Sequence, residues 1–169
     1  MPRKPDTPGR VAPPVHARSA RTQAQFEAFS AVLAAAGQLE RELVEVLKRA
    51  ELSLAQYNVL RILRGAGAAG LACGQVGGRL IRHDPDVTRL TDRLEKRGLL
   101  DRTREAADRR IVRTRITAAG LALLADLDDP IDRLHERQMG HMSEQRLASL
   151  KKLLEDTCAR AGSRVWSGT

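Results

Sequence analysis

The segment that follows the first 21 residues has apolar side chains at alternating steps of three and four. They occupy seven positions: Phe29, Val32, Ala36, Leu39, Leu43, Val46 and Ala50. Because residues three and four apart lie on one side of an α-helix, this spacing predicts a long amphipathic helix with a continuous apolar seam. Such a seam is typical of a helix that packs along another helix.

Capping residues mark the next two helices. Ser53 and Gln56 form the pattern of a capping box, which predicts a second helix from about residue 54 to residue 64. The glycine-rich stretch 65–70 interrupts the helical pattern. We expect a third helix over residues 71–82.

A short fourth helix is predicted after the sequence Asp84-Pro85-Asp86. Asp84 suits the N-cap position, and Pro85 is favoured at the first helical position. Apolar residues then fall on one face, at Val87, Leu90 and Leu94. Polar and basic residues occupy the other face, at Thr88, Arg89, Arg93 and Lys96. Gly98 is expected to end this helix.

A β-hairpin is predicted directly after this helix. Its strands are expected over residues 99–103 and 111–116, with a polar turn over 104–110 between them. In the second strand, Arg113 and Arg115 alternate with apolar neighbours, as in a strand with one buried face.

Two more helices are predicted in the last third of the chain. Thr117 is a suitable N-cap for a helix through Leu127, which Pro130 is expected to kink or restart. A last helix is expected to begin at Ser143. The overall pattern is therefore mostly α with one small β-hairpin.

Composition restricts the kind of core and the kind of site. The 169 residues include one Trp, one Tyr and two Phe, so the core must be aliphatic and a base-stacking surface is not expected. Cys73 and Cys158 lie 85 residues apart without paired spacing, which argues against a disulfide framework or a zinc site. There is no apolar run long enough to span a membrane and no signal-peptide pattern, so a cytoplasmic location without membrane association is expected.

Positive charge is concentrated in two regions of the chain. Residues 79–115 contain twelve Arg and Lys against seven Asp and Glu, which accounts for +5 of the total of +8. Residues 1–22 contribute a further +4. A localised excess of this kind favours a polyanionic partner, although a basic run can also be a solvated surface.

Motifs for small-molecule chemistry are weak. Residues 65–70 match a GxGxxG pattern, but a predicted helix rather than a strand precedes them, so dinucleotide binding is not expected. His135 and His141 are six residues apart, which does not suit a metal site on a helix. We expect neither catalytic activity nor a metal or other cofactor.

The most informative segment is residues 83–117. It contains DVTRLTDRLEKRGLLDR at 86–102, then Asp108-Arg109-Arg110, then Ile116-Thr117-Ala118-Ala119-Gly120. This combination resembles the winged helix-turn-helix of the multiple-antibiotic-resistance-regulator (MarR) family of transcriptional regulators, and the resemblance extends over roughly residues 22–161.

The resemblance implies a winged helix-turn-helix flanked by N- and C-terminal dimerisation helices. Five regions follow from it. They are a disordered basic arm (1–21), an N-terminal dimerisation helix (22–50), the DNA-binding domain (51–117), C-terminal dimerisation helices (118–162) and a flexible tail (163–169).

The implied function is sequence-specific binding of double-stranded DNA in the nucleoid, with a repressor on a pseudo-palindromic operator as the favoured form. The residues expected to contact DNA are Asp86, Val87, Thr88, Arg89, Arg93, Lys96, Arg109 and Arg110. The family pattern implies that Asp108 orients a wing arginine. The alternative for any of these arginines is a pair with a neighbouring acid such as Asp92 or Glu95. A non-specific architectural nucleic-acid-binding protein is the alternative function, and an enzyme is the third.

The resemblance also implies a homodimer built from the terminal helices. The candidate interface residues are Phe26, Phe29, Val32, Leu33, Leu147, Leu150, Leu154 and Trp166. The alternative is that these residues close the core of a monomer. Many relatives bind a small phenolic or lipophilic effector between the dimer helices and the winged helix, and such a partner is implied here.

Cys73 is a candidate redox site because it lies near the predicted DNA-binding unit. In the peroxide-sensing branch of the family the sensing cysteine lies in the first helix, where this chain has none. A small buried cysteine is therefore the favoured interpretation of Cys73.

Overall fold

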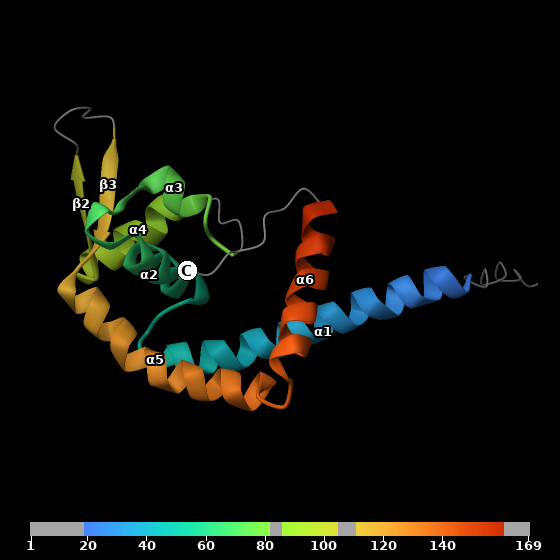
Figure 1. Ribbon diagram of the computed structural model, residues 1–169. Helices are drawn as coiled ribbons and strands as arrows, with labels where there is room; N and C mark the ends of the chain where they lie inside the picture. The colour runs from blue at the N-terminus through green and yellow to red at the C-terminus, as the bar shows by residue number, and fades with distance from the viewer. Residues whose placement is uncertain (1–18, 82–85, 105–110, 161–169) are drawn as a thin grey trace, which may run out of the picture. The chain divides into compact units, whose positions relative to one another are not determined.

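The computed structural model describes residues 19–81, 86–104 and 111–160, which form mainly helices with one small sheet (Figure 1). The α-helices are α1 (Ala20–Lys48), α2 (Leu54–Ala66), α3 (Cys73–Gly77), α4 (Val87–Lys96), α5 (Ala118–Met139) and α6 (Glu144–Arg160). The strands are β1 (Leu71–Ala72), β2 (Leu100–Arg104) and β3 (Val112–Ile116), and a short 3₁₀ helix, η1 (Gly67–Ala69), precedes β1. This architecture confirms the predicted fold class.

The chain divides into two compact units, residues 1–37 and residues 38–169. In the described part of the first unit, the N-terminal half of α1 is a single helical run with mostly exposed side chains. All the other elements belong to the second unit, which contains the sheet and the candidate site.

The sheet has three antiparallel strands in the order β1-β3-β2. Leu100 pairs with Ile116 at one end of the β2–β3 hairpin, which confirms the predicted hairpin. Strand β1 was not predicted: Leu71 pairs with Thr114 on the other side of β3. The prediction of one helix over 71–82 is therefore wrong, because its first two residues are a strand and α3 has only five residues.

Glycines explain why this segment forms a short helix and a tight approach instead of a long helix. Gly70 has a φ of +61°, and a Cβ there would lie 2.5 Å from the carbonyl oxygen of Thr114. A Cβ at Gly77 would lie 3.0 Å from Val87 of α4. Gly70 thus allows β1 to lie close against β3. The GxGxxG stretch follows helix α2 rather than a strand, which does not suit a dinucleotide-binding motif.

Helix α4 begins later than expected. Its N-cap is Asp86, whose Oδ1 accepts a hydrogen bond of 3.2 Å from the backbone N–H of Arg89. The prediction of Asp84 as the N-cap is therefore wrong. Asp84 and Asp86 both have a side chain that suits the N-cap, and the structure uses Asp86. Asp84 and Pro85 themselves lie outside the described residues. Gly98, with a φ of +69°, follows the last turn as expected.

The core is aliphatic, as the composition predicts. Its fully buried side chains include Leu47, Leu60, Leu63, Leu94, Leu100 and Leu124. Helix α2 is fastened to α5 by Arg64, whose Nη1 lies 3.0 and 2.8 Å from the two carboxylate oxygens of Asp128.

Thr117 joins the end of α4 to the beginning of α5. Its hydroxyl donates to the carbonyl oxygen of Gly98 at 2.7 Å and accepts from the backbone N–H of Gly120 at 3.1 Å. A Cβ at Gly120 would lie only 2.2 Å from the carbonyl oxygen of Leu99, so this close approach requires glycine.

Helix α5 runs unbroken through Pro130 to Met139, so the expected restart does not occur. Proline removes one hydrogen bond of the helix, and the buried side chains Ile131 and Leu134 on the following turn keep the helix packed. Within the described residues, no helix has the length and apolar character needed to cross a membrane.

Candidate nucleic-acid interface

Helix α4 has two chemically different faces, as its sequence predicts. Leu90, Thr91 and Leu94 are buried against the core. The residues Thr88, Arg89, Arg93 and Lys96 are exposed, and we call them the basic face of α4. One side of this ten-residue helix is therefore anchored in the core, and the other side presents polar and cationic side chains to solvent.

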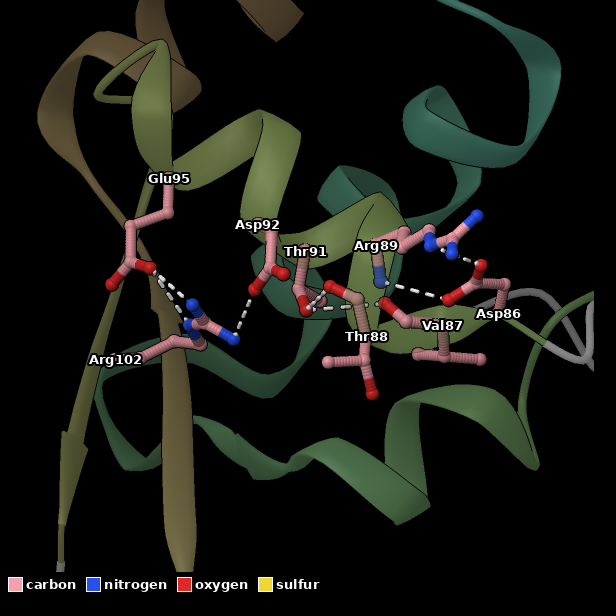
Figure 2. A network of polar contacts seen from close by, with 8 residues as sticks. All are labelled: Asp86, Val87, Thr88, Arg89, Thr91, Asp92, Glu95 and Arg102. Atoms are coloured by element: carbon pink, nitrogen blue, oxygen red, sulfur yellow. Dashed lines mark hydrogen bonds and ion pairs between the residues drawn. The ribbon is translucent and has the colours of Figure 1, made fainter.

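The buried threonine of α4 is satisfied inside the helix. The Thr91 hydroxyl donates to the carbonyl oxygens of Val87 and Thr88, at 3.1 and 2.9 Å (Figure 2). The Thr91 hydroxyl therefore needs no hydrogen-bond partner outside α4.

Arg89 is tethered at the beginning of α4. Its Nε lies 3.0 Å from Oδ2 of Asp86, and its side chain is still 78% exposed (Figure 2). Because Asp86 also caps the helix, its carboxylate holds both the backbone and the side chain of Arg89. This arrangement limits the directions in which the guanidinium points while leaving its donors accessible to solvent.

The two acids of α4 beyond its N-cap pair with a strand residue. Arg102 of β2 reaches across to α4, where its Nη1 lies 2.7 Å from Oδ1 of Asp92 (Figure 2). Its Nη2 and Nε lie 2.5 and 2.9 Å from Oε2 of Glu95. The hydrogen bond to Glu95 raises the pKa of Arg102 above its usual value, so the guanidinium carries its charge in this contact.

This pairing bears on the alternative assignment for the basic face. Asp92 and Glu95 are bonded to Arg102, and among the described residues Arg93 and Lys96 have no ion-pair or hydrogen-bond partner for their side chains. Arg93 and Lys96 are thus available to an external anion.

The arginines of β3 donate hydrogen bonds to other parts of the protein. Arg113 donates from Nη1 to the carbonyl oxygen of Ala69 at 3.1 Å. Arg115 donates from Nε to the carbonyl oxygen of Ala68 at 2.9 Å and from Nη1 to the hydroxyl of Thr103 at 2.8 Å. These contacts fasten η1 to the sheet.

Arg97 has a similar structural role at the other end of the domain. Its guanidinium donates to the carbonyl oxygens of Glu51 and Ala50, at 2.7 and 2.9 Å. Glu51 has a φ of +52° in the turn after α1, and Arg97 binds the carbonyls of that turn. The sequence pattern did not indicate this contact, because the two partners are more than forty residues apart.

The predicted wing tip lies outside the described residues. This concerns Asp108, Arg109 and Arg110, for which the prediction stands untested. The described strands lead to it, and Arg104 at the end of β2 is exposed.

The predicted interface residues show large apolar exposure. Phe29 is 61% exposed, and Phe26, Val32 and Leu33 on the same helix are between 46% and 57% exposed. On α6, Leu154 is 36% exposed, and Leu147 and Leu150 are half-buried. Trp166 lies outside the described residues.

Cys73 is half-buried at the first position of α3, so the expectation of a buried cysteine is wrong. The strand β1 ends directly before it, so Cys73 lies where the strand passes into α3. Within the described residues, no group of three or more His, Cys, Asp or Glu side chains could hold a metal ion.

Known proteins share this architecture and parts of this sequence. The family model described as "MarR family" matches residues 52–112. A MarR transcription factor from Planctomyces limnophilus is 41% identical, with a TM-score of 0.61 over 76% of this chain and 93% of that chain. The HTH-type transcriptional repressor IacR of Pseudomonas putida is 24% identical over 70% of each chain.

A third similarity concerns the fold. A mutant of MarR from E. coli, complexed with operator DNA, superimposes with a TM-score of 0.70 and 23% identity, over 82% of this chain and 99% of that one. Together with the 41% identity to the Planctomyces limnophilus protein, these similarities confirm the resemblance. The chain belongs to the MarR family of DNA-binding, winged-helix transcriptional regulators, which is a family of regulators and not of enzymes.

Proposed function

We propose that this protein is a homodimeric, sequence-specific repressor that binds a pseudo-palindromic operator. The observation that supports this proposal most directly is the basic face of α4. Arg93 and Lys96 have no side-chain partner in the described part of the chain, and the opposite face of the helix is buried in the core. A short anchored helix with exposed guanidinium groups suits insertion into the major groove.

Within this proposal the residues of α4 have different tasks. Arg89 and Arg93 offer planar forks of donors that match the edge of guanine or a phosphate. Thr88 offers a hydroxyl and a methyl group to neighbouring bases, and Lys96 offers a charge to the backbone. Asp86 and Val87, at the beginning of the helix, complete the set. The wing residues Arg109 and Arg110 are proposed to contact the flanking backbone or minor groove, with Asp108 orienting one of them.

The homodimer is supported by apolar exposure on the terminal helices. Phe29 and Leu33 of α1 and Leu153 of α6 are each more than half exposed. Surfaces of this kind are uncommon on monomers and mark interaction sites. The name of the similar IacR protein, a repressor, supports the direction of regulation.

We further propose that a small phenolic or lipophilic compound releases the protein from DNA. The second unit contains an open cavity of about 560 Å³ between α1 and α5, of a size that suits such a ligand. Its lining combines apolar side chains with three arginines and three acids: Val46, Ala50, Leu123, Leu127, Pro130, Arg49, Arg133, Arg137, Glu42, Glu45 and Asp126.

The test is binding of the purified full chain to a duplex from the upstream region of its own gene and to a scrambled duplex of equal length. Fluorescence anisotropy at near-physiological salt gives both affinities. A preference of about a thousandfold is the lower range for specific regulators. Equal and steeply salt-dependent binding to both duplexes would favour a non-specific architectural protein. If selection from random DNA also yields no preferred sequence, the protein is of that non-specific kind.

A further inference from the structure

Among the described residues, the ion pairs between β2 and α4 are made by one side chain, that of Arg102. Arg102 pairs through its backbone with Thr114 in the middle of the β2–β3 hairpin. Its guanidinium leaves the sheet and bonds to two carboxylates one turn apart, Asp92 at 2.7 Å and Glu95 at 2.5 Å (Figure 2). The side chain is only 24% exposed, because it lies against α4 (Figure 2).

The charges of α4 show why this contact matters for an anionic partner. From Asp86 to Lys96 the helix and its cap contain three acids and three bases, so their net charge is zero. Asp86 is engaged with Arg89, and the other two acids are engaged with Arg102. Because the two acids are neutralised by a residue outside the helix, Arg93 and Lys96 are left without a partner among the described residues.

We propose that Arg102 is a positioning residue for DNA binding, which fixes strand β2 of the wing to α4 through Asp92 and Glu95 so that helix and wing bind DNA as one unit. The inference rests on the proposed function. In this proposal Asp92 and Glu95 favour DNA binding because they hold Arg102. Their negative charge alone would instead oppose binding to a polyanion.

The two explanations predict opposite changes in DNA affinity when these acids are neutralised. The double variant D92N/E95Q raises the charge of each protomer by two, and simple electrostatics predicts tighter binding to DNA. If Arg102 positions the wing, the variant loses two charge-assisted contacts and binds an operator selected from random DNA about tenfold or more weakly. Tighter or unchanged binding by the folded variant would overturn the proposal.

A matched control is available on the same strand. Asp101 is exposed, and its side chain has no partner among the described residues, so D101N raises the charge without touching the contact with α4. This variant is expected to bind DNA as tightly as the wild type or slightly more tightly. A loss of affinity with D101N equal to that of D92N/E95Q would show that the effect is not specific to the pair.

A second variant separates positioning from folding. R102K keeps the charge but can bridge fewer oxygens than the guanidinium fork, so its affinity should lie between those of the wild type and R102Q. Thermal unfolding of each variant shows whether the fold is retained. If D92N/E95Q fails to fold, the single variant E95Q keeps the Asp92 contact and is measured in the same way; unchanged affinity would then count against the proposal.

A measurement without DNA distinguishes this inference from the proposed function. In R102Q, amides of residues 100–104 should exchange with deuterium at least severalfold faster than in the wild type, while those of α2 are unchanged. Faster exchange together with no selective DNA binding by the wild type would refute the function but retain the contact. Unchanged exchange in R102Q would refute the positioning role itself.

Discussion

The basic residues of α4 and those of the β2–β3 hairpin have different partners in this structure. On the hairpin, Arg102, Arg113 and Arg115 donate to protein oxygens, while Arg104 at the end of β2 is exposed. On α4, Arg93 and Lys96 are exposed without a partner in the described part of the chain. A count of charge along the sequence treats each of these cations alike. The difference indicates that, within the described residues, fewer cations are available to an anion than the basic segment contains, and that Arg93 and Lys96 of α4 are among them.

The largest effect on DNA binding is expected for Arg93→Ala. If the side chain contacts a base, affinity for the operator falls by about 1–3 kcal/mol and discrimination at one base position is lost. Because Arg93 is exposed, the free energy of unfolding should change by less than about 0.5 kcal/mol. Anisotropy on single-base operator variants and urea unfolding measure the two quantities.

Arg93→Lys is the matched control for this prediction. Lysine keeps the charge but not the bidentate fork, so binding to scrambled DNA should be retained while the preference for the operator falls. If Arg93→Ala lowers the stability instead of the affinity, Arg93 belongs with the structural arginines of the hairpin, and the distinction between the two regions is lost.

Arg115→Ala addresses the hairpin. Losing the bonds to Ala68 and Thr103 should lower the free energy of unfolding by about 1 kcal/mol, because both groups are partly accessible to water. Urea unfolding at one fixed protein concentration measures this change. The ratio of operator to scrambled affinity should stay the same, and a collapse of that ratio would place Arg115 on the DNA-binding surface.

Between the arginines of β3 lies a polar group without a partner. The Thr114 hydroxyl is fully buried at the centre of the sheet, and its oxygen has no hydrogen-bond partner among the described residues. Thr114→Val keeps the shape and removes the cost of burying the hydroxyl, so the protein should become more stable by about 1 kcal/mol. Thermal unfolding tests this; Thr103→Val on β2 is the contrast, because it removes an exposed hydroxyl that accepts from Arg115 and should therefore slightly destabilise the protein. A loss of stability in Thr114→Val would mean that the hydroxyl has a partner in solution.

Local patterns in the sequence predicted the parts of the fold that depend on neighbouring residues. The capping box at Ser53, the two faces of α4 and the cap at Thr117 all rest on residues three or four positions apart, and the structure contains each of them. The cap of α4 was assigned to Asp84 rather than to Asp86 because either carboxylate satisfies the same local rule.

Contacts between distant residues were not predictable in this way. Strand β1 has two residues, too few for a periodic pattern, and it exists because β3 offers a free edge more than forty residues away. The partner of Arg97 is the turn after α1, and the partners of Arg113 are the carbonyls beside η1. A count of positive charge cannot separate these arginines from Arg93, since the difference lies in which acceptors the fold brings near.

The smallest effect is expected at Lys96, within the basic face of α4 itself. Its charge should act on the phosphate backbone, so Lys96→Ala should weaken binding to operator and scrambled duplexes alike, by less than about 1 kcal/mol, and lower the salt slope by about one per protomer. Titrations at several salt concentrations give the slope. Lys152→Ala, at another exposed lysine, on α6, should leave the slope unchanged. If both substitutions lower the slope equally, the charge of the whole molecule rather than the basic face of α4 governs binding.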